Sequence, residues 1–226
     1  MISYSLRCAC LGTSVVQSSK FYGKSMQCQQ IMPTVRVDRL IAYALNLKLA
    51  PSSLKPEYFT EQMKIHNTIQ RGGGNIVGDI LIMDTWSELV HQLFSDSSLR
   101  FIANYCDLSD IARRKVKSHG RLSKEKFHSF YSCLSGCLLN QKVKAIIVID
   151  FPALFDNRVA MKKRSKEITK ALLKISANEP NFYLVMIPYS EIKIAENDFY
   201  PYHFCKETIL KYSRALDEIL VELALR

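Results

Sequence analysis

The chain has 226 residues, 48% of them hydrophobic and 10% aromatic, and its formal net charge is +10. A chain of this size and hydrophobic content removes roughly 70% of its unfolded surface from water, which is enough for one core. It has 8 Gly and 7 Pro and no low-complexity tract, which argues against a flexible linker. We therefore expect a single domain over residues 1–226.

The lack of a recognisable secretory signal and the pattern of cysteines both indicate a reducing compartment. Arg7 interrupts the apolar stretch at the N-terminus and no small-residue cleavage site follows it, which argues against a secretory signal. No apolar stretch is long enough to span a bilayer. The seven cysteines form no Cys-x-x-Cys pair, which argues against a disulfide framework and a zinc site. We expect free thiols, no bound metal and a cytoplasmic location.

Strand and helix patterns alternate along the chain. Four short apolar runs have the length and composition of buried strands, namely residues 6–11, 80–83, 145–149 and 182–187. Apolar residues at helical spacing predict helices at residues 37–47, 86–94, 124–139, 158–175 and 204–225. Such alternation is typical of parallel strands joined by right-handed crossovers. The predicted fold is an α/β three-layer sandwich with a mainly parallel, flavodoxin-like sheet.

A candidate nucleophile follows the first predicted strand. The strand runs into Gly12, Thr13 and Ser14, and a glycine here lets the backbone turn sharply into a helix. Such an elbow would expose the Ser14 hydroxyl and direct N–H groups near Gly12 and Ser14 at a developing oxyanion. Asn75 and Asn104 are further candidates for an oxyanion donor. A serine in such a turn is also a common helix N-cap, and that alternative stays open.

His203 is the best-placed histidine to act as a base for Ser14. It lies in the segment 197–203, after the fourth predicted strand and directly before the last helix. In an open parallel fold this position returns the chain to the edge that carries Ser14. Asp198 in the same segment could hold the imidazole tautomer, as the third member of a triad does. A histidine packed at a helix start and a surface aspartate are the alternatives.

This arrangement resembles the SGNH (GDSL-type) hydrolases, which place a Gly-[Asp/Ser/Asn]-Ser nucleophile after the first strand and an Asp-x-x-His motif before the final helix. It is most similar to a bacterial subgroup related to the GSCFA proteins, found among capsule and surface-polysaccharide genes. The stretches 79–89 and 202–204 carry this similarity. The sequence departs from the pattern at Thr13, and five positions rather than three separate Asp198 from His203.

The resemblance implies an acetyltransferase or esterase that acts on a carbohydrate, such as a capsular or surface polysaccharide precursor. His203 would take the proton of Ser14, Ser14 would accept the acyl group, and Asp84 and Trp86 would contact the substrate. The enzyme would hold no bound cofactor, and acyl-coenzyme A would be its co-substrate in transfer. Because that donor is a multiply charged anion, basic residues are candidates for binding it: Arg113, Arg114, Lys162, Lys163 and Arg164.

Two other function classes stay open. Asp84 and Asp150 each end a predicted strand, and carboxylates at adjacent strand ends can hold magnesium, as in a metal-dependent nuclease. Acids at such positions also commonly cap the next helix. The positive charge, concentrated at residues 113–126 and 158–174, would also suit a non-catalytic nucleic-acid-binding module. Such modules interleave aromatic residues for base stacking, and these clusters contain almost none.

Overall fold

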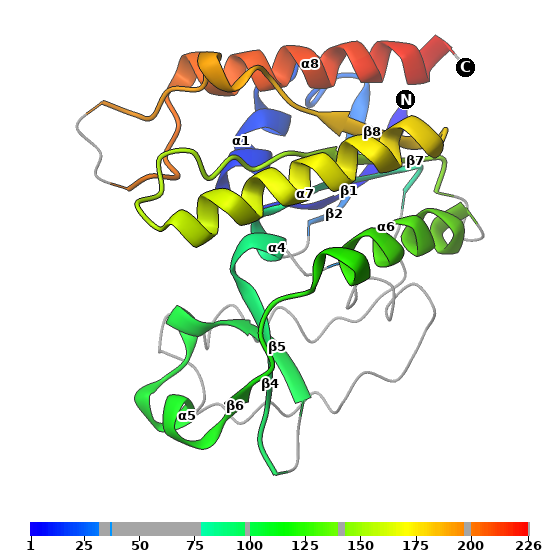
Figure 1. Cartoon of the computed structure of the whole chain (residues 1–226). Helices are drawn as coiled ribbons and strands as arrows, with labels where there is room; N and C mark the ends of the chain where they lie inside the picture. The colour runs from blue at the N-terminus through cyan, green and yellow to red at the C-terminus, as the bar shows by residue number, and fades with distance from the viewer. Residues whose placement is uncertain (32–36, 38–77, 98–99, 140–142, 197–199, 226) are drawn as a thin grey trace.

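A five-stranded parallel sheet organises the chain (Figure 1). The structure is a computed structural model that describes residues 1–31, 37, 78–97, 100–139, 143–196 and 200–225. The strand order is β2-β1-β3-β7-β8, and every neighbouring pair is parallel. The strands are β1 (Ile2–Arg7), β2 (Met26–Ile31), β3 (Ile80–Asp84), β7 (Ala145–Ile149) and β8 (Phe182–Val185). The predicted α/β fold with a mainly parallel sheet is confirmed.

Two pairs of helices cover the two faces of the sheet, which gives three layers (Figure 1). On one face α1 (Cys10–Gln17) contacts α8 (Lys206–Leu225). On the other face α6 (Lys124–Leu139) contacts α7 (Val159–Asn178). This is the arrangement expected of βαβ units, because crossovers on either side of the first strand place their helices on opposite faces.

A small antiparallel sheet is inserted between β3 and α6. It follows the short helix α4 (Trp86–Val90) and lies below the parallel sheet in Figure 1. A small hydrophobic cluster of its own forms around Phe94 and Leu108. Its strand order is β5-β4-β6, and its elements are β4 (His91–Ser95), β5 (Arg100–Asn104), η2 (Tyr105–Asp107), α5 (Asp110–Lys115) and β6 (Lys117–Ser118). The sequence patterns did not predict this sheet.

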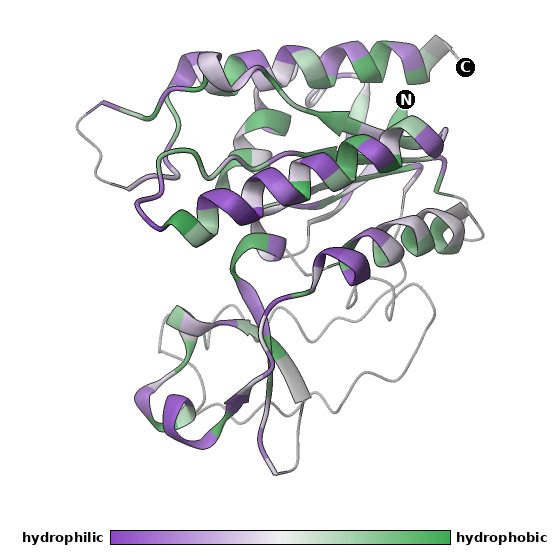
Figure 2. Cartoon of the chain, in the orientation of Figure 1, coloured by the Kyte–Doolittle hydropathy of each residue, from purple (hydrophilic) through white to green (hydrophobic). Residues whose placement is uncertain are grey.

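The main core packs on both faces of the interior strands β3 and β7. Every residue of β3 and β7 is buried, which explains why both sequences are continuous apolar runs rather than alternating patterns. In α7 the buried residues recur at helical spacing, and hydrophilic residues occupy much of the surface seen in Figure 2. None of the helices that the structure describes has both the length and the apolar character needed to cross a bilayer.

Several predicted boundaries were wrong. The first strand, expected at 6–11, is Ile2–Arg7, and α1 already begins at Cys10. The helix expected at 86–94 ends at Val90, and residues 91–95 continue as β4. Strand β2 was not predicted, because its sequence Met-Gln-Cys-Gln-Gln-Ile contains few apolar residues. The helix predicted at 37–47 lies almost wholly outside the described residues.

The helices α6, α7 and α8 follow the predicted segments. α6 has the predicted bounds, whereas α7 begins one residue later and ends three residues later than predicted. α8 begins at Lys206, two residues after the expected start. Their long amphipathic patterns make these elements easier to predict from sequence than a short strand. One further single turn, η3 (Tyr189–Glu191), follows β8.

Candidate functional site

The carboxyl ends of β1 and β3 meet where the strand order reverses. In open α/β sheets this is the position where ligands bind. The buried carboxylate of Asp84 spans the two strand ends: one oxygen accepts a hydrogen bond from the Ala9 N–H at 2.6 Å, and the other accepts one from the Trp86 N–H at 3.2 Å. The side chain of Asp84 therefore ties the start of α1 to the start of α4.

Gly12 lets α1 approach this carboxylate closely. A Cβ added at Gly12 would lie 2.6 Å from the Cys8 Sγ and 2.9 Å from an Asp84 oxygen. These distances are shorter than real carbon contacts allow, so the glycine is required for packing. Its predicted role in a sharp turn is wrong, because the chain turns at Cys8 and Ala9 and Gly12 is the third residue of the helix.

An aromatic cluster covers the carboxyl ends of β3 and β7. The ring centroid of Trp86 lies 4.8 Å from that of Phe151 and 4.7 Å from that of Tyr202, in tilted and edge-on contacts. Phe151 follows β7 by two positions, and Tyr202 comes from the loop before α8. The predicted return of this loop to the carboxyl edge is thus seen at Tyr202, the residue directly before His203.

Asp156, Arg158 and Tyr202 form a polar group beside the aromatic cluster. The guanidinium of Arg158 donates to both carboxylate oxygens of Asp156, at 2.9 and 2.7 Å, and also to the Tyr202 hydroxyl at 2.9 Å. The Tyr202 hydroxyl donates to the same carboxylate. The hydrogen bonds from Arg158 lower the pKa of Asp156, and the carboxylate raises the pKa of Arg158. The Asp156 carboxylate compensates the charge of Arg158, and the pair fixes the orientation of an exposed guanidinium at the sheet edge.

The sequence reasoning did not identify this group as part of the site. Arg158 was counted only within a basic cluster, and Asp156 was not singled out. The spacing Asp156-x-Arg158 at the start of a helix is a usable signal, because an aspartate there accepts from the N–H two residues later, here at 2.7 Å. Nothing in the sequence indicated that Tyr202 would complete the group.

His203 is exposed beside Tyr200. The two ring centroids lie 4.7 Å apart, and Tyr200 in turn contacts the ring of Tyr202. The main chain of His203 is held on both sides, because its N–H donates to the Tyr200 carbonyl and its carbonyl accepts from the Ala195 N–H. Asp198, the predicted third member of the triad, lies outside the described residues.

Ser14 lies in the second turn of α1. As the fifth residue of the helix it lies beyond the first four N–H groups that lack intrahelical partners, so its N–H is not the exposed donor that an elbow would supply. Its half-buried hydroxyl makes no hydrogen bond with any residue that the structure describes. The residue of α1 that stands exposed in the first turn is Cys10.

Asp150 is buried at the carboxyl end of β7. Both of its carboxylate oxygens lie 3.0 Å from the Thr169 hydroxyl, which also lies 2.9 Å from the Tyr189 hydroxyl. Burial raises the pKa of Asp150 to about 7, against a usual value of 3.8, although the hydrogen bonds act in the opposite direction. Desolvation followed by the Asp150 charge raises the pKa of Tyr212.

The two strand-end aspartates do not form a metal site with other described residues. Asp84 is engaged by main-chain N–H groups and Asp150 by Thr169. No cluster of three or more His, Cys, Asp or Glu side chains suited to a metal occurs in the described ranges. The capping alternative describes Asp84 well, since it accepts from the N–H of Trp86 at the start of α4.

Two charged side chains are buried near the carboxyl edge of the sheet. Arg7 at the end of β1 and Glu88 in α4 are both almost completely buried. One oxygen of Glu88 accepts from the Val37 N–H at 2.8 Å and lies 3.5 Å from the Tyr131 hydroxyl. Desolvation and this charge raise the pKa of Tyr131 well above its usual value. Arg7 lies in the segment expected to be a buried strand, whereas the burial of Glu88 was not predicted.

The predicted donor-binding residues are spread over two regions. Arg113 and Arg114 lie on α5, where the Arg113 guanidinium bonds to Asp110 and to the Cys106 carbonyl. Lys162 and Lys163 are exposed in the first turns of α7. The guanidinium of Arg164 instead donates to the main-chain carbonyls of residues 88 and 122, at 2.9 and 2.8 Å. Arg164 therefore links structural elements.

The remaining predicted positions are placed as follows. Asn104 ends β5, and its side chain accepts from the Cys106 N–H, so it caps η2. Asn75 lies outside the described residues. All seven cysteines are free thiols, and three of them, Cys10, Cys106 and Cys133, are exposed. No family model matches the sequence, and neither does any curated protein.

Proposed function

We propose that the protein transfers an acyl group to a carbohydrate, or hydrolyses a carbohydrate ester, at the carboxyl edge of the parallel sheet. His203 acts as the general base and Ser14 as the nucleophile that carries the acyl group. The observation that carries the proposal is the packing of Tyr202 on Trp86 and Phe151, at 4.7 and 5.8 Å between ring centroids. This packing holds the residue next to His203 over the ends of β3 and β7.

The aromatic and charged groups at this edge suit a sugar ligand. Sugar rings have apolar faces that pack on aromatic rings, and the exposed Tyr200 and the partly buried Trp86 are the candidate surfaces. Arg158 supplies a positive charge whose orientation is fixed by Asp156. Because Asp156 compensates this charge, Arg158 contributes oriented N–H donors rather than net positive charge to an anionic donor such as acyl-coenzyme A or to an acidic sugar.

Proton transfer requires the Ser14 hydroxyl and the His203 imidazole to come within hydrogen-bond reach when substrate binds. Catalytic hydrogen bonds are often longer in a ligand-free enzyme and shorten in the substrate complex. The loop that holds His203 is fixed at Tyr202 but exposed at Tyr200 and His203. Cys10, one turn before Ser14 in α1, is the competing nucleophile because it is exposed at the start of that helix.

The test is acyl-enzyme formation, followed by intact mass after mixing with an activated acetyl ester or with acetyl-coenzyme A. Ser14→Ala and His203→Gln should each reduce turnover by roughly 10²- to 10⁴-fold. The matched controls are Ser18→Ala, at the C-cap of the same helix, and His119→Gln, directly after β6. Both controls should keep the wild-type rate.

Two results would reject the assignment. Full turnover in Ser14→Ala excludes Ser14 as the nucleophile, and loss of the acetylated species in Cys10→Ala alone transfers the role to Cys10. Ester hydrolysis in water without donor binding would identify an esterase, whereas transfer to an added sugar would identify a transferase. Wild-type protein that forms no acyl-enzyme with either reagent would contradict the proposed function as a whole.

A further inference from the structure

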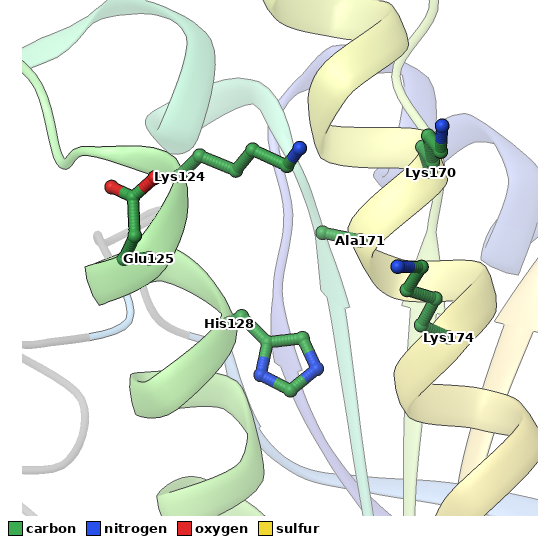
Figure 3. Close-up of a pocket in the computed structure, with 6 residues that line it drawn as sticks. All are labelled: Lys124, Glu125, His128, Lys170, Ala171 and Lys174. Carbon is green, nitrogen blue, oxygen red and sulfur yellow. The ribbon is translucent and has the colours of Figure 1, made fainter.

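A pocket of about 170 Å³ lies between α6 and α7, away from the aromatic cluster (Figure 3). The first two turns of α6 form one wall and the second half of α7 forms the other. Its lining is rich in basic side chains and contains no Phe, Tyr or Trp. The lining residues are Lys124, Glu125, His128, Lys170, Ala171 and Lys174.

Three of the basic groups face the space between the two helices, whereas the Lys170 ammonium lies on the side of α7 away from α6 in Figure 3. In Figure 3 the Lys124 side chain extends from α6 toward α7, while His128 and the end of Lys174 face the same space. The carboxylate of Glu125 points away from it. Ala171 is buried and leaves room on the wall of α7.

Acidic groups near the three lysines are few: the charge of Lys124 acts on the neighbouring Glu125 and helps to lower the pKa of that carboxyl group. None of them forms an ion pair with any residue that the structure describes. Elsewhere on the surface such partners are present: Lys193 lies 3.1 Å from Glu207, and Lys211 lies 3.0 Å from Glu191. Three lysines and one glutamate leave an excess of positive charge around this space, and an anion bound between the lysines reduces their mutual repulsion.

We propose that this pocket binds a phosphate group. A phosphate dianion is compact and multiply charged, and it accepts hydrogen bonds from ammonium and imidazole groups at the same time. The positive end of the α6 dipole lies at the same end of the pocket, since Lys124 is the first residue of that helix. His128 supplies the one ring in the lining, so the charges of the lysines rather than base stacking dominate recognition, and the ligand group is the phosphate.

The phosphate group can belong to a free anion, to a phosphorylated small molecule or to a nucleic-acid backbone. The pocket's size and its converging lysines favour a terminal phosphate, which can enter from one side. A backbone phosphate would instead need the neighbouring phosphates to lie along α7, over Lys162, Lys163 and Lys166, which are exposed at its other end. This inference does not depend on the acyl-transfer proposal, because it uses different residues on a different surface.

The experiment is isothermal titration calorimetry of the full chain with inorganic phosphate and pyrophosphate, at constant ionic strength set with sodium chloride. The double variant Lys124→Gln/Lys174→Gln removes two charges from the pocket. The control Lys115→Gln/Lys117→Gln removes two charges from exposed lysines outside the pocket. We expect the pocket variant to bind pyrophosphate at least about tenfold more weakly and the control to change less than about twofold.

A third variant, Glu125→Gln, should leave the affinity unchanged or raise it, because it removes the only carboxylate in the lining. Equal losses in the pocket and control variants would overturn the proposal and indicate general attraction by surface charge. Wild-type protein that binds neither anion at matched ionic strength would overturn it too. If both double variants weakened the binding of a single-stranded oligonucleotide equally, the binding site would be an extended surface rather than a discrete pocket.

Discussion

Replacing the buried Asp150 carboxyl group tests whether its environment holds a proton at neutral pH. Asp150 is almost completely buried, and burial raises its pKa to about 7 from 3.8. In the folded protein the carboxyl group therefore keeps its proton up to a higher pH than in the unfolded chain. Asparagine has similar size and does not titrate, so Asp150→Asn removes this pH dependence.

The sign and size of the effect follow from proton linkage. Because the folded-state pKa is raised, the stabilising contribution of the protonated group is complete below about pH 4 and is lost as the pH rises to about 7. A difference of about 3 pKa units corresponds to roughly 4 kcal/mol in total. Between about pH 5 and about pH 8 the expected change is about 3 kcal/mol, because part of the window lies below pH 5.

Urea unfolding measures this change. The fluorescence of Trp86, the only tryptophan in the chain, reports the transition. The free energy of unfolding of Asp150→Asn minus that of wild type should increase by about 3 kcal/mol from about pH 5 to about pH 8. Asp110→Asn, whose carboxylate is exposed, is the matched control and should show almost no such trend. A constant difference between Asp150→Asn and wild type across this range would refute the argument.

Three further predictions concern α1 and its neighbours. Gly12→Ala should lower the free energy of unfolding by about 1–3 kcal/mol in urea titrations, because the added Cβ would lie 2.6 Å from the Cys8 Sγ; an unchanged midpoint contradicts this packing. Ser19→Ala should lower the free energy of unfolding by about 1–3 kcal/mol, because the buried Ser19 hydroxyl donates to the Asp217 carboxylate of α8 at 2.5 Å. Ser18→Ala, at an exposed position, is the control and should change the free energy of unfolding by less than about 0.5 kcal/mol. Burial, and to a lesser extent the neighbouring Asp84 charge, raises the pKa of Cys8. In the native protein a thiol reagent should therefore modify the exposed Cys10 well before Cys8, as measured by peptide mapping. Equal rates of modification at the two cysteines would be inconsistent with this environment.

The sequence alone determined the central part of the fold. β3 and β7 lie between other strands and under helices on both faces, so their sequences had to be apolar throughout. α6, α7 and α8 each bury one stripe, and the 3.6-residue spacing of that stripe is visible without any structure. These patterns also located Asp84 and Asp150 at strand ends.

The tertiary structure decided the elements whose sequences are mostly polar. β1 buries Ser5 and Arg7 because β2 and β3 lie on either side of it, and burial of these polar residues depends on neighbours far along the chain. β2 lies at the edge of the sheet, where a strand needs few apolar residues, so its sequence gave no clear pattern. Because β1 ends earlier in the sequence than predicted, α1 also begins earlier, and Ser14 lies in the second turn of the helix rather than at its start.

The candidate site also has one part that the sequence indicated and one part that only the tertiary structure revealed. The sequence indicated the loop before α8, because a chain that leaves the last parallel strand must pass the carboxyl edge before its final helix. It could not indicate that Tyr202 would reach Trp86, Asp156 and Arg158, since no local spacing links residues more than forty positions apart. Local periodicity therefore determined which segments form strands and helices, whereas long-range packing determined which side chains meet.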